Sequence, residues 1–442
     1  MDDEDMMLSL ARMIVDKATA AGAQGVWASA NRSREVEFTG RDGDLEKVKE
    51  ATSMSVGLSL YVDGRFSTHN TTSITREDRV DSFIAEAVAL TRALQPDKDR
   101  ELPDPALFAG RSEADLDLLD HRVDSMSKDE RRTWLDVLDA AARTDERVIS
   151  ATGYVGGTLT EGAAASTNGF SGSWEGSQLW VGAEVTVGDG PDKKPEGGYW
   201  VGVRHLDDVP DLEGIAKEAL RRATSRIGST KGPSRKTTMI VDPTAGGRLV
   251  GRLLSAADAR SIYQGRSFWA GTLGQKLLPE KLTITDDPFI PRGLGSRHFD
   301  GEGIAARQRV IIDEGVVSTL FADTYYGRKA GLEPTGAGTS NLVVKPGVDK
   351  GLEELCAEAG EGVYVTSWLG GNADGTTGDF SFGVRGHTVS GGVIGAPIGE
   401  MNVTGNLLDL FANLALVGND PWPYRATRVP TLVFEGVDFS GA

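Results

Sequence analysis

The sequence predicts an α+β protein in which predominantly antiparallel sheets are flanked by helices. Stretches with helical periodicity alternate irregularly with strand-like stretches, and no regular repeat of strand, helix and strand indicates a parallel sheet. The chain has 56 glycines among its 442 residues, enough to let many short strands turn or bulge. No internal repeat of solenoid length is present. We therefore expect an N-terminal α/β region followed by a glycine-rich, β-barrel-like C-terminal domain.

The domain boundaries follow from length and from two segments of low apolar content. A domain usually holds roughly 100 to 200 residues, so this chain needs more than one core. Residues 95–105 are rich in Pro, Asp and Lys, and residues 228–236 are rich in Gly, Ser, Lys and Pro, as linkers are. The predicted domains are a helix and sheet unit over 1–100, a helix and β-meander unit over 106–228, and a β-rich unit over 237–442.

In the first unit, apolar residues at three- and four-residue steps predict a helix over 6–22. Strands are expected over 34–39 and 54–62, and Asp63-Gly64 is a favourable hairpin turn before a third strand over 65–69. Thr75 offers an N-cap oxygen for a second helix that ends near Leu94, with Asp78 in the capping-box position.

In the second unit, Ser127 and Glu130 have the spacing of a capping box and predict the start of a helix. Strand-like stretches over 148–206 are interrupted by turn residues, among them Thr167-Asn168-Gly169, and indicate a long meander. A helix over 212–225 should close this unit. In the last unit, helices are expected over 247–259, 352–357 and 407–417, and short strands between them.

Charge and composition exclude several classes of protein. The 47 basic and 65 acidic residues give a formal charge of −18, which would repel nucleic acid and anionic lipid. No stretch approaches about 18 uninterrupted apolar residues, and the acidic N-terminus Met1–Asp5 does not resemble a secretory signal. The single Cys356 has no partner for an internal disulfide. We expect a cytoplasmic protein that contacts neither membrane nor nucleic acid directly.

The five histidines form no recognisable metal motif. None belongs to HExxH or HExxxH, and none has a second histidine four residues away on a predicted helix, so we expect no zinc site in this chain. His205-Leu206-Asp207 and His298-Phe299-Asp300 place a histidine and a carboxylate on one face only in extended backbone, and a structural role is the simpler interpretation of both. The sequence also lacks a GxSxG elbow, a P-loop and a GxGxxG unit between strand and helix.

The most unusual region is a pair of polar, glycine-rich stretches over 377–387 and 397–406. One interpretation is a tightly turned β-meander in which side chains satisfy nearby backbone groups. The other is a groove whose exposed strands pair with an extended peptide. The candidate peptide-binding or interface residues are Asp379, Ser381, Arg385, His387, Glu400, Thr404 and Asn406.

Several phrases in this order resemble the TldD/PmbA family, and specifically its PmbA (TldE) branch. They are Gly57-Leu58-Ser59-Leu60-Tyr61, Asp63-Gly64-Arg65, Phe299-Asp300-Gly301-Glu302-Gly303, Gly378-Asp379-Phe380-Ser381, Gly405-Asn406-Leu407, Val417-Gly418-Asn419-Asp420 and Pro430-Thr431-Leu432. The resemblance covers nearly the whole chain and is strongest after Thr237.

In the TldD branch of that family, a helix that opens the C-terminal domain carries HExxxH, whose histidines hold zinc. The matching positions here are Gly251, Arg252 and Ala256, of which two have no donor atom and one is a fixed cation. The cysteine that the catalytic branch uses is also absent from 421–429. The resemblance therefore implies no catalytic residue and no metal in this chain, with zinc carried by a partner subunit.

The resemblance further implies that the zinc-free branch assembles with a zinc-bearing TldD-like homologue and that the pair degrades unfolded or leader peptides. A homodimeric peptide-binding or scaffold protein without proteolysis is the alternative. A third reading uses Asp379, Ser381 and His387 as a local acid/base set, because their numbers share the parity of one strand face. The family is also described as a modulator of DNA gyrase, and the charge of −18 favours an effect through a protein partner.

Overall fold

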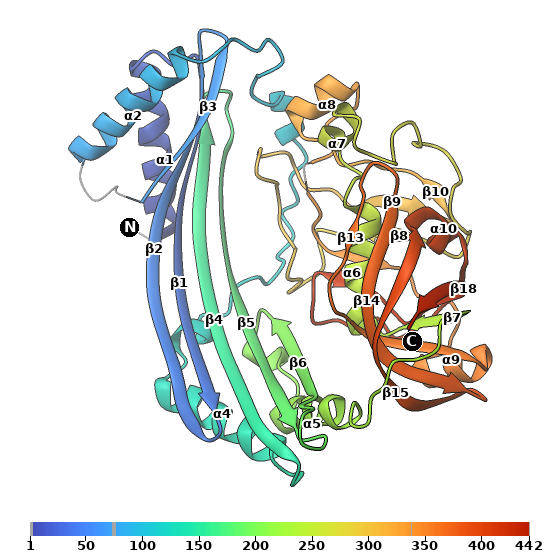
Figure 1. Cartoon of the computed structure of the whole chain (residues 1–442). Helices are drawn as coiled ribbons and strands as arrows, with labels where there is room; N and C mark the ends of the chain where they lie inside the picture. Colours follow the sequence, from blue (N-terminus) through green and yellow to red (C-terminus); the bar gives the residue numbers. More distant parts are fainter. Residues whose placement is uncertain (1–2, 73–76, 337, 442) are drawn as a thin grey trace.

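The computed structural model describes residues 3–72, 77–336 and 338–441. Two lobes lie next to each other (Figure 1): a long curved sheet with helices on its outer side, and a lobe of short strands and helices from the C-terminal half of the chain. The segment over residues 93–121 runs between the two lobes before the chain returns to the sheet.

The N-terminal lobe is a six-stranded antiparallel sheet of order β3-β2-β1-β4-β5-β6. Its strands are β1 (Gly25–Arg41), β2 (Asp44–Val62), β3 (Arg65–Thr71), β4 (Val148–Ser166), β5 (Ser171–Val187) and β6 (Glu196–Val203). Strand β1 pairs with β4 from Trp27↔Ser166 to Arg41↔Thr152, so segments on both sides of residue 100 share one sheet.

Helices cover only the outer face of this sheet (Figure 1). They are α1 (Asp3–Ala20), α2 (Glu77–Arg92), α4 (Lys128–Ala142) and α5 (Leu212–Thr224). Two apolar cores result, one under α1 and α2 and the other under α4 and α5. On β5 the odd-numbered residues from Leu179 to Val187 are buried in the second core. The even-numbered residues therefore point toward the inner, concave face.

The two edges of the long sheet are covered to different extents. Strand β3 pairs with β2 only over Val56–Val62, and within the described residues no strand pairs with the outer edge of Asp44–Ser55. The opposite edge, at the start of β5, is covered by the segment that links the lobes, where Ser177 N donates to Leu118 O. This linking segment includes η1 (Pro105–Phe108) and α3 (Arg122–Ser125), and the short turn η2 (Leu206–Asp208) follows β6.

The C-terminal lobe contains a closed five-stranded β-barrel. Its order is β12-β7-β18-β15-β14, and an additional pairing of β12 with β14 closes it. The barrel strands are β7 (Arg235–Val241), β12 (Gly362–Trp368), β14 (Asp379–Ser390), β15 (Val393–Asn406) and β18 (Leu432–Ser440), with β13 (Asn372–Ala373) and β16 (Leu414–Val417) added at its rim.

A second sheet of order β10-β9-β8-β11-β17 packs with the barrel around the largest apolar core. Its strands are β8 (Ile284–Asp286), β9 (Arg309–Asp313), β10 (Val316–Val317), β11 (Leu342–Val344) and β17 (Thr427–Arg428). The helices of this lobe are α6 (Pro243–Leu254), α7 (Ala259–Tyr263), α8 (Thr324–Ala330), α9 (Leu352–Ala359) and α10 (Leu407–Ala412).

The predicted fold class is confirmed, as is the hairpin at Asp63-Gly64, which joins β2 to β3. Ser127 and Glu130 make both hydrogen bonds of the capping box that begins α4. The proposed cap at Thr75 and Asp78 lies outside the residues whose side chains are described.

Two predicted helices of the C-terminal half are wrong in extent. The helix over 407–417 ends at Ala412, and Leu414–Val417 is strand β16, because its residues pair with β18. The helix over 247–259 begins earlier, at Pro243 after the N-cap Asp242, and ends at Leu254.

None of the helices in the described ranges is long and apolar enough to cross a membrane.

Candidate functional site

The two polar, glycine-rich stretches of the sequence form one hairpin, β14–β15. Asp379 faces Asn406 and Ser381 faces Thr404 across it, and Asp379, Ser381 and Thr404 are exposed. Asn406 Nδ2 donates to Asp379 Oδ1 (3.1 Å) and the Thr377 hydroxyl donates to Oδ2 (2.9 Å). These two bonds lower the pKa of Asp379. The hairpin is thus an exposed polar ribbon whose end is held by local side-chain bonds.

The same hairpin does not bring His387 to Asp379 and Ser381. Both register shifts of the hairpin, between Val384 and Gly386 and after His387, place the extra residue on β15, so β14 keeps its alternation of faces. His387 lies six residues along β14 from Ser381, roughly 20 Å in extended backbone. It is buried beside Tyr364, and its Nε2 donates to Ser225 O at 3.0 Å while its Nδ1 has no hydrogen-bond partner. Burial lowers the pKa of His387. The three residues share the parity of one strand face, but the separation along β14 and the burial of His387 rule out a local acid/base set.

The remaining two residues of the candidate set lie near the same irregularity. Arg385 is half-buried on β14, and Glu400 is exposed in the irregular stretch of β15 between Ile398 and Met401. All seven candidate residues are therefore on one hairpin, four of them along its exposed ribbon and its end.

Helix α6 offers no metal donors at the positions where the family resemblance places them. Gly251 is exposed, and a Cβ there would have open space around it. Arg252 is in the last turn, and Ala256 lies past the helix end, buried in the core. Cys356 is buried on α9, and burial raises its pKa to about 11. Among the described residues, no three His, Cys, Asp or Glu side chains are grouped as a metal site would need. Zinc does not fit this set of residues.

A cavity of about 910 Å³ lies between the concave face of the long sheet and the C-terminal lobe. Its volume is in the range of sites that hold a ligand of substantial size. Its wall comes from β1, β4 and β5, from the linking segment 115–121 and from the loop 296–301. Residues more than 250 positions apart in the sequence therefore meet in one space.

Aromatic rings on the sheet face of this region lie against glycines. A Cβ at Gly162 would be 2.5 Å from the Trp174 ring, and Cβ atoms at Gly182 and Gly202 would be 2.4 Å and 2.7 Å from the rings of Trp200 and Trp180. Trp174 lines the cavity, and the other two rings continue the row along β5 and β6. The glycines thus seat rings that remain partly exposed.

The phrase 299–303 forms the side of the cavity that faces the sheet. Phe299 lines it and packs against Trp174 at 6.0 Å between ring centroids. Asp300 Oδ1 accepts from the N–H groups of Glu302 and Ile304, which folds the turn. Burial raises the pKa of Glu302, which also accepts from Thr324 at the start of α8. This phrase holds the C-terminal lobe against the sheet.

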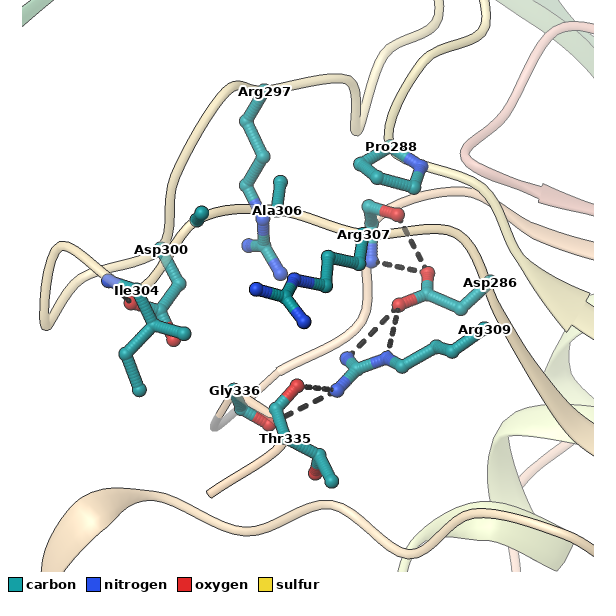
Figure 2. A pocket seen from close by; sticks show the side chains of 12 residues that line it. Asp286, Pro288, Arg297, Asp300, Ile304, Ala306, Arg307, Arg309, Thr335 and Gly336 are labelled. Carbon is teal, nitrogen blue, oxygen red and sulfur yellow. Dashed lines mark hydrogen bonds and ion pairs between the residues drawn. The ribbon is translucent and has the colours of Figure 1, made fainter. Parts of the chain in front are cut away.

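A small pocket behind this turn shows how the arginines of the loop are used (Figure 2). Arg297, Arg307 and Arg309 point toward it. Arg309 is paired with Asp286 at 2.9 Å and donates to backbone carbonyls, Thr335 O among them. Arg297 donates to Gly338 O at 3.0 Å, and its pKa is lowered by burial. These hydrogen bonds and the ion pair hold the loop 296–309 in place on its side away from the large cavity.

Arg204 joins the two lobes at the cavity wall. Its guanidinium donates to Gly293 O (2.8 Å), Leu294 O (2.9 Å) and Ser177 O (3.1 Å). Burial lowers its pKa to about 10. The neighbouring His205 is also buried, with Nε2 donating to the carbonyl of Asp117. Its sequence neighbours form the turn η2, so the His205–Asp207 pair is not extended as a shared face would require.

Sequence reasoning missed the cavity as a site. Its lining residues carry no shared spacing, because they come from three strands, a linker and a loop. The sequence does contain one signal for this site, because the phrase 299–303 is among those that carry the family resemblance. The spacing of His298 and Asp300 alone does not indicate a cavity.

The chain is similar to known proteins over almost all of its length. Models described as PmbA/TldA metallopeptidase domain 1, central domain and C-terminal domain match residues 28–91, 121–227 and 234–441. Metalloprotease PmbA of Escherichia coli O157:H7 is 27% identical over 410 residues, which cover 90% of this chain and 88% of that protein. Its homologue in Haemophilus influenzae is 27% identical over 430 residues, 97% of this chain and 94% of that protein.

Two solved structures share the fold. A protein of Bacteroides thetaiotaomicron, named as a candidate modulator of DNA gyrase, is 35% identical with a TM-score of 0.94 and 98% of each chain covered. TldE of Thermococcus kodakarensis is 20% identical with a TM-score of 0.87, covering 97% of this chain and 99% of that chain. The second likeness shows the fold alone.

Proposed function

This chain belongs to the PmbA/TldD metallopeptidase family, and we propose that it is the noncatalytic subunit of a complex with a zinc-bearing TldD-like homologue. In this proposal the complex degrades or processes unfolded or leader peptides in the cytoplasm. The zinc and the peptide-cleaving chemistry come from the partner.

The donor set on helix α6 carries this proposal. Zinc peptidases bind the metal through imidazole, carboxylate or thiolate groups and use a base to activate water. Gly251 and Ala256 have no side-chain donor, and Arg252 carries a fixed positive charge that repels a cation. A family member with these residues has retained the fold around the position while having no means to hold zinc there.

The peptide-handling part of the proposal rests on the two surfaces described above. The exposed ribbon of β14–β15 presents Asp379, Ser381 and Thr404, and the interlobe cavity is large enough for several residues of an extended chain. Both surfaces are compatible with substrates that lack folded structure. The resemblance to the PmbA (TldE) branch of the family is the reason to expect a TldD-type partner.

The test is peptidase activity on an unfolded peptide by this chain alone, by a zinc-bearing homologue alone, and by the two purified together. Each sample is assayed with and without a metal chelator, and zinc is measured in each protein. We expect cleavage only in the pair and only without chelator, with no stoichiometric zinc in this chain. Chelator-resistant cleavage by this chain alone would contradict the proposal.

A homodimeric peptide-binding or scaffold protein is the second candidate, favoured by the same two surfaces without any need for zinc. It predicts that this chain forms a stable dimer by itself and does not change the activity of the homologue. Light scattering of the mixed and separate proteins distinguishes the two candidates.

A further inference from the structure

We propose that the interlobe cavity and the aromatic row that continues from it bind extended peptides through arginine side chains. The inference rests on the proposed function in that it names a substrate class for a peptide-handling subunit. It concerns binding by this chain itself, and so it is tested without the partner.

The first step is the shape of the sheet face. The rings of Trp174, Trp180 and Trp200 lie against Gly162, Gly202 and Gly182, so one face of each ring is turned away from the sheet. Each ring is partly exposed. A flat indole face that remains accessible is the best side-chain surface for a cation, because the ring quadrupole is negative above its plane.

The second step is that the chain already places a guanidinium on this row. Arg425 lies 5.6 Å from the centroid of Trp180 and 5.5 Å from that of Trp422. Arg111 makes the same contact, at 4.8 Å, with Phe299 at the cavity. Over the described part of the chain, no cation lies over the rings of Trp174 or Trp200. Trp174 packs against Phe299 and Trp200 against Tyr154, and the part of each ring that stays exposed is available to a ligand cation.

The third step is charge. Carboxylates outnumber guanidiniums in the cavity wall, and both wall arginines, Arg204 and Arg297, are held by backbone carbonyls. The carboxylate of Asp115 is exposed and forms no ion pair in the described structure. An occupant with positive charge is therefore favoured over a neutral or acidic one, within a chain whose formal charge is −18.

Guanidinium matches these features better than ammonium does. It is planar and stacks on indole while its edge still donates to a carboxylate. Trp174 and Trp180 are six residues apart on β5, roughly 20 Å in extended backbone, and an extended peptide along the strand points side chains to one face at every second residue.

The test uses fluorescein-labelled twelve-residue peptides of Gly, Ser and Ala with three arginines at alternate positions, and measures their anisotropy with the purified full chain. Matched peptides carry citrulline, the neutral isostere of arginine, or glutamate at the same positions. We expect the arginine peptide to bind about tenfold or more tightly than the citrulline peptide, with affinity that falls as salt rises. Equal affinity for the arginine and citrulline peptides would overturn the inference.

Two variants locate the site. Trp174→Leu should weaken binding of the arginine peptide by about 2- to 30-fold, the range of a cation–π contact. Asp115→Asn, at an exposed position where folding is not at stake, should weaken it by up to about fivefold. Glu175→Gln, on the opposite face of β5 from Trp174, and Glu86→Gln on α2 remove the same charge from the outer surface and should change nothing. If Asp115→Asn binds as these two controls do, the inference is wrong, whatever the folding state of Trp174→Leu.

The outcomes separate the two proposals. Arginine-dependent binding by this chain, together with an inactive pair, would retain the site and reject the subunit role. Chelator-sensitive cleavage by the pair, without any preference for arginine over citrulline in binding, would retain the role and reject the site.

Discussion

Glycine serves opposite purposes in the two lobes. In the barrel, a Cβ at Gly386 would be 1.8 Å from the carbonyl oxygen of Tyr364 on the neighbouring strand, and at Gly371 it would be 2.0 Å from Ser381 O. On the long sheet, a Cβ at Gly162 or Gly182 would instead meet an indole ring. At these positions the barrel glycines let two backbones approach, whereas the two sheet glycines make room for indole rings. The first pair serves closure of the barrel, and the second serves the presentation of rings on the sheet face.

The two lobes also differ in how their edges are handled. The pairing of β12 with β14 closes the barrel, so its strands need no cover. The long sheet stays open, and its β5 edge requires the segment around Leu118 and Asp120. Three substitutions test this difference: one where the barrel closes, one in the segment that covers the β5 edge, and one at a glycine beneath an indole ring.

The largest effect should come from Gly386→Ala. The added methyl group has a backbone oxygen in its place, and the barrel must open or shift to accept it. We expect a loss of more than about 4 kcal/mol in the free energy of unfolding, measured by urea denaturation.

Gly251→Ala is the matched control for this change. It adds the same methyl group on α6, where nothing lies within 4 Å, and should stabilise the helix by about 0.5–1 kcal/mol. A loss of less than about 1 kcal/mol in Gly386→Ala would mean that the barrel is not closed at this point.

Asp120→Asn tests the cover over the sheet edge. Burial alone would raise the pKa of Asp120, but hydrogen bonds from the Arg122 side chain and from the N–H groups of Leu206 and Arg122 outweigh it and lower the pKa to about 2. Because this pKa is below the value of about 3.9 in the unfolded chain, the carboxylate contributes stability above about pH 4 and loses it as pH falls toward 2.

We therefore expect Asp120→Asn to cost about 2 kcal/mol near pH 7 and the difference from the unmodified chain to vanish as the pH falls from about 4 to 2. Thermal unfolding across this range measures it. A difference that stays constant with pH would show that the loss comes from packing and not from the ionised carboxylate.

Gly162→Ala should lower the free energy of unfolding by about 1–3 kcal/mol, less than Gly386→Ala does, because the Trp174 ring can move where a backbone oxygen cannot. The displaced ring should also alter the near-ultraviolet circular dichroism of the folded protein. If Gly162→Ala destabilises as much as Gly386→Ala, the two kinds of glycine are not distinct.

Local rules predicted the helices of this chain well and the strands only in part. Ser127 and Glu130 identify a helix start from two side chains, and the apolar period of 6–22 identifies a buried helix face. The sequence predicts strand β2 only from Met54, whereas the strand begins at Asp44. The first part escapes prediction because both of its faces are exposed, so polar and apolar residues do not alternate along it.

The candidate site shows a different limit. The ribbon of β14–β15 could be found because its residues are close in sequence, yet the contacts with Ser225 and Tyr364 that bury His387 come from distant segments, which parity counting does not include. The cavity could not be found, because it exists only once β1, β5 and the loop around Phe299 are brought together. The lack of metal donors at Gly251, Arg252 and Ala256 can be recognised from the sequence alone, because it depends on residue type and not on the three-dimensional arrangement.

The uncovered edge of β2 has a consequence for association between copies of the protein. Asp44–Ser55 presents unpaired backbone to solvent, the arrangement by which sheets of separate molecules join. Its side chains include Glu46, Lys47, Lys49 and Glu50, and each molecule also carries the repulsion of eighteen net negative charges at pH 7. Near the isoelectric point of about 4.8 that general repulsion disappears. Acidification should then make this edge the first place where molecules join, which sets a lower pH limit for handling concentrated protein.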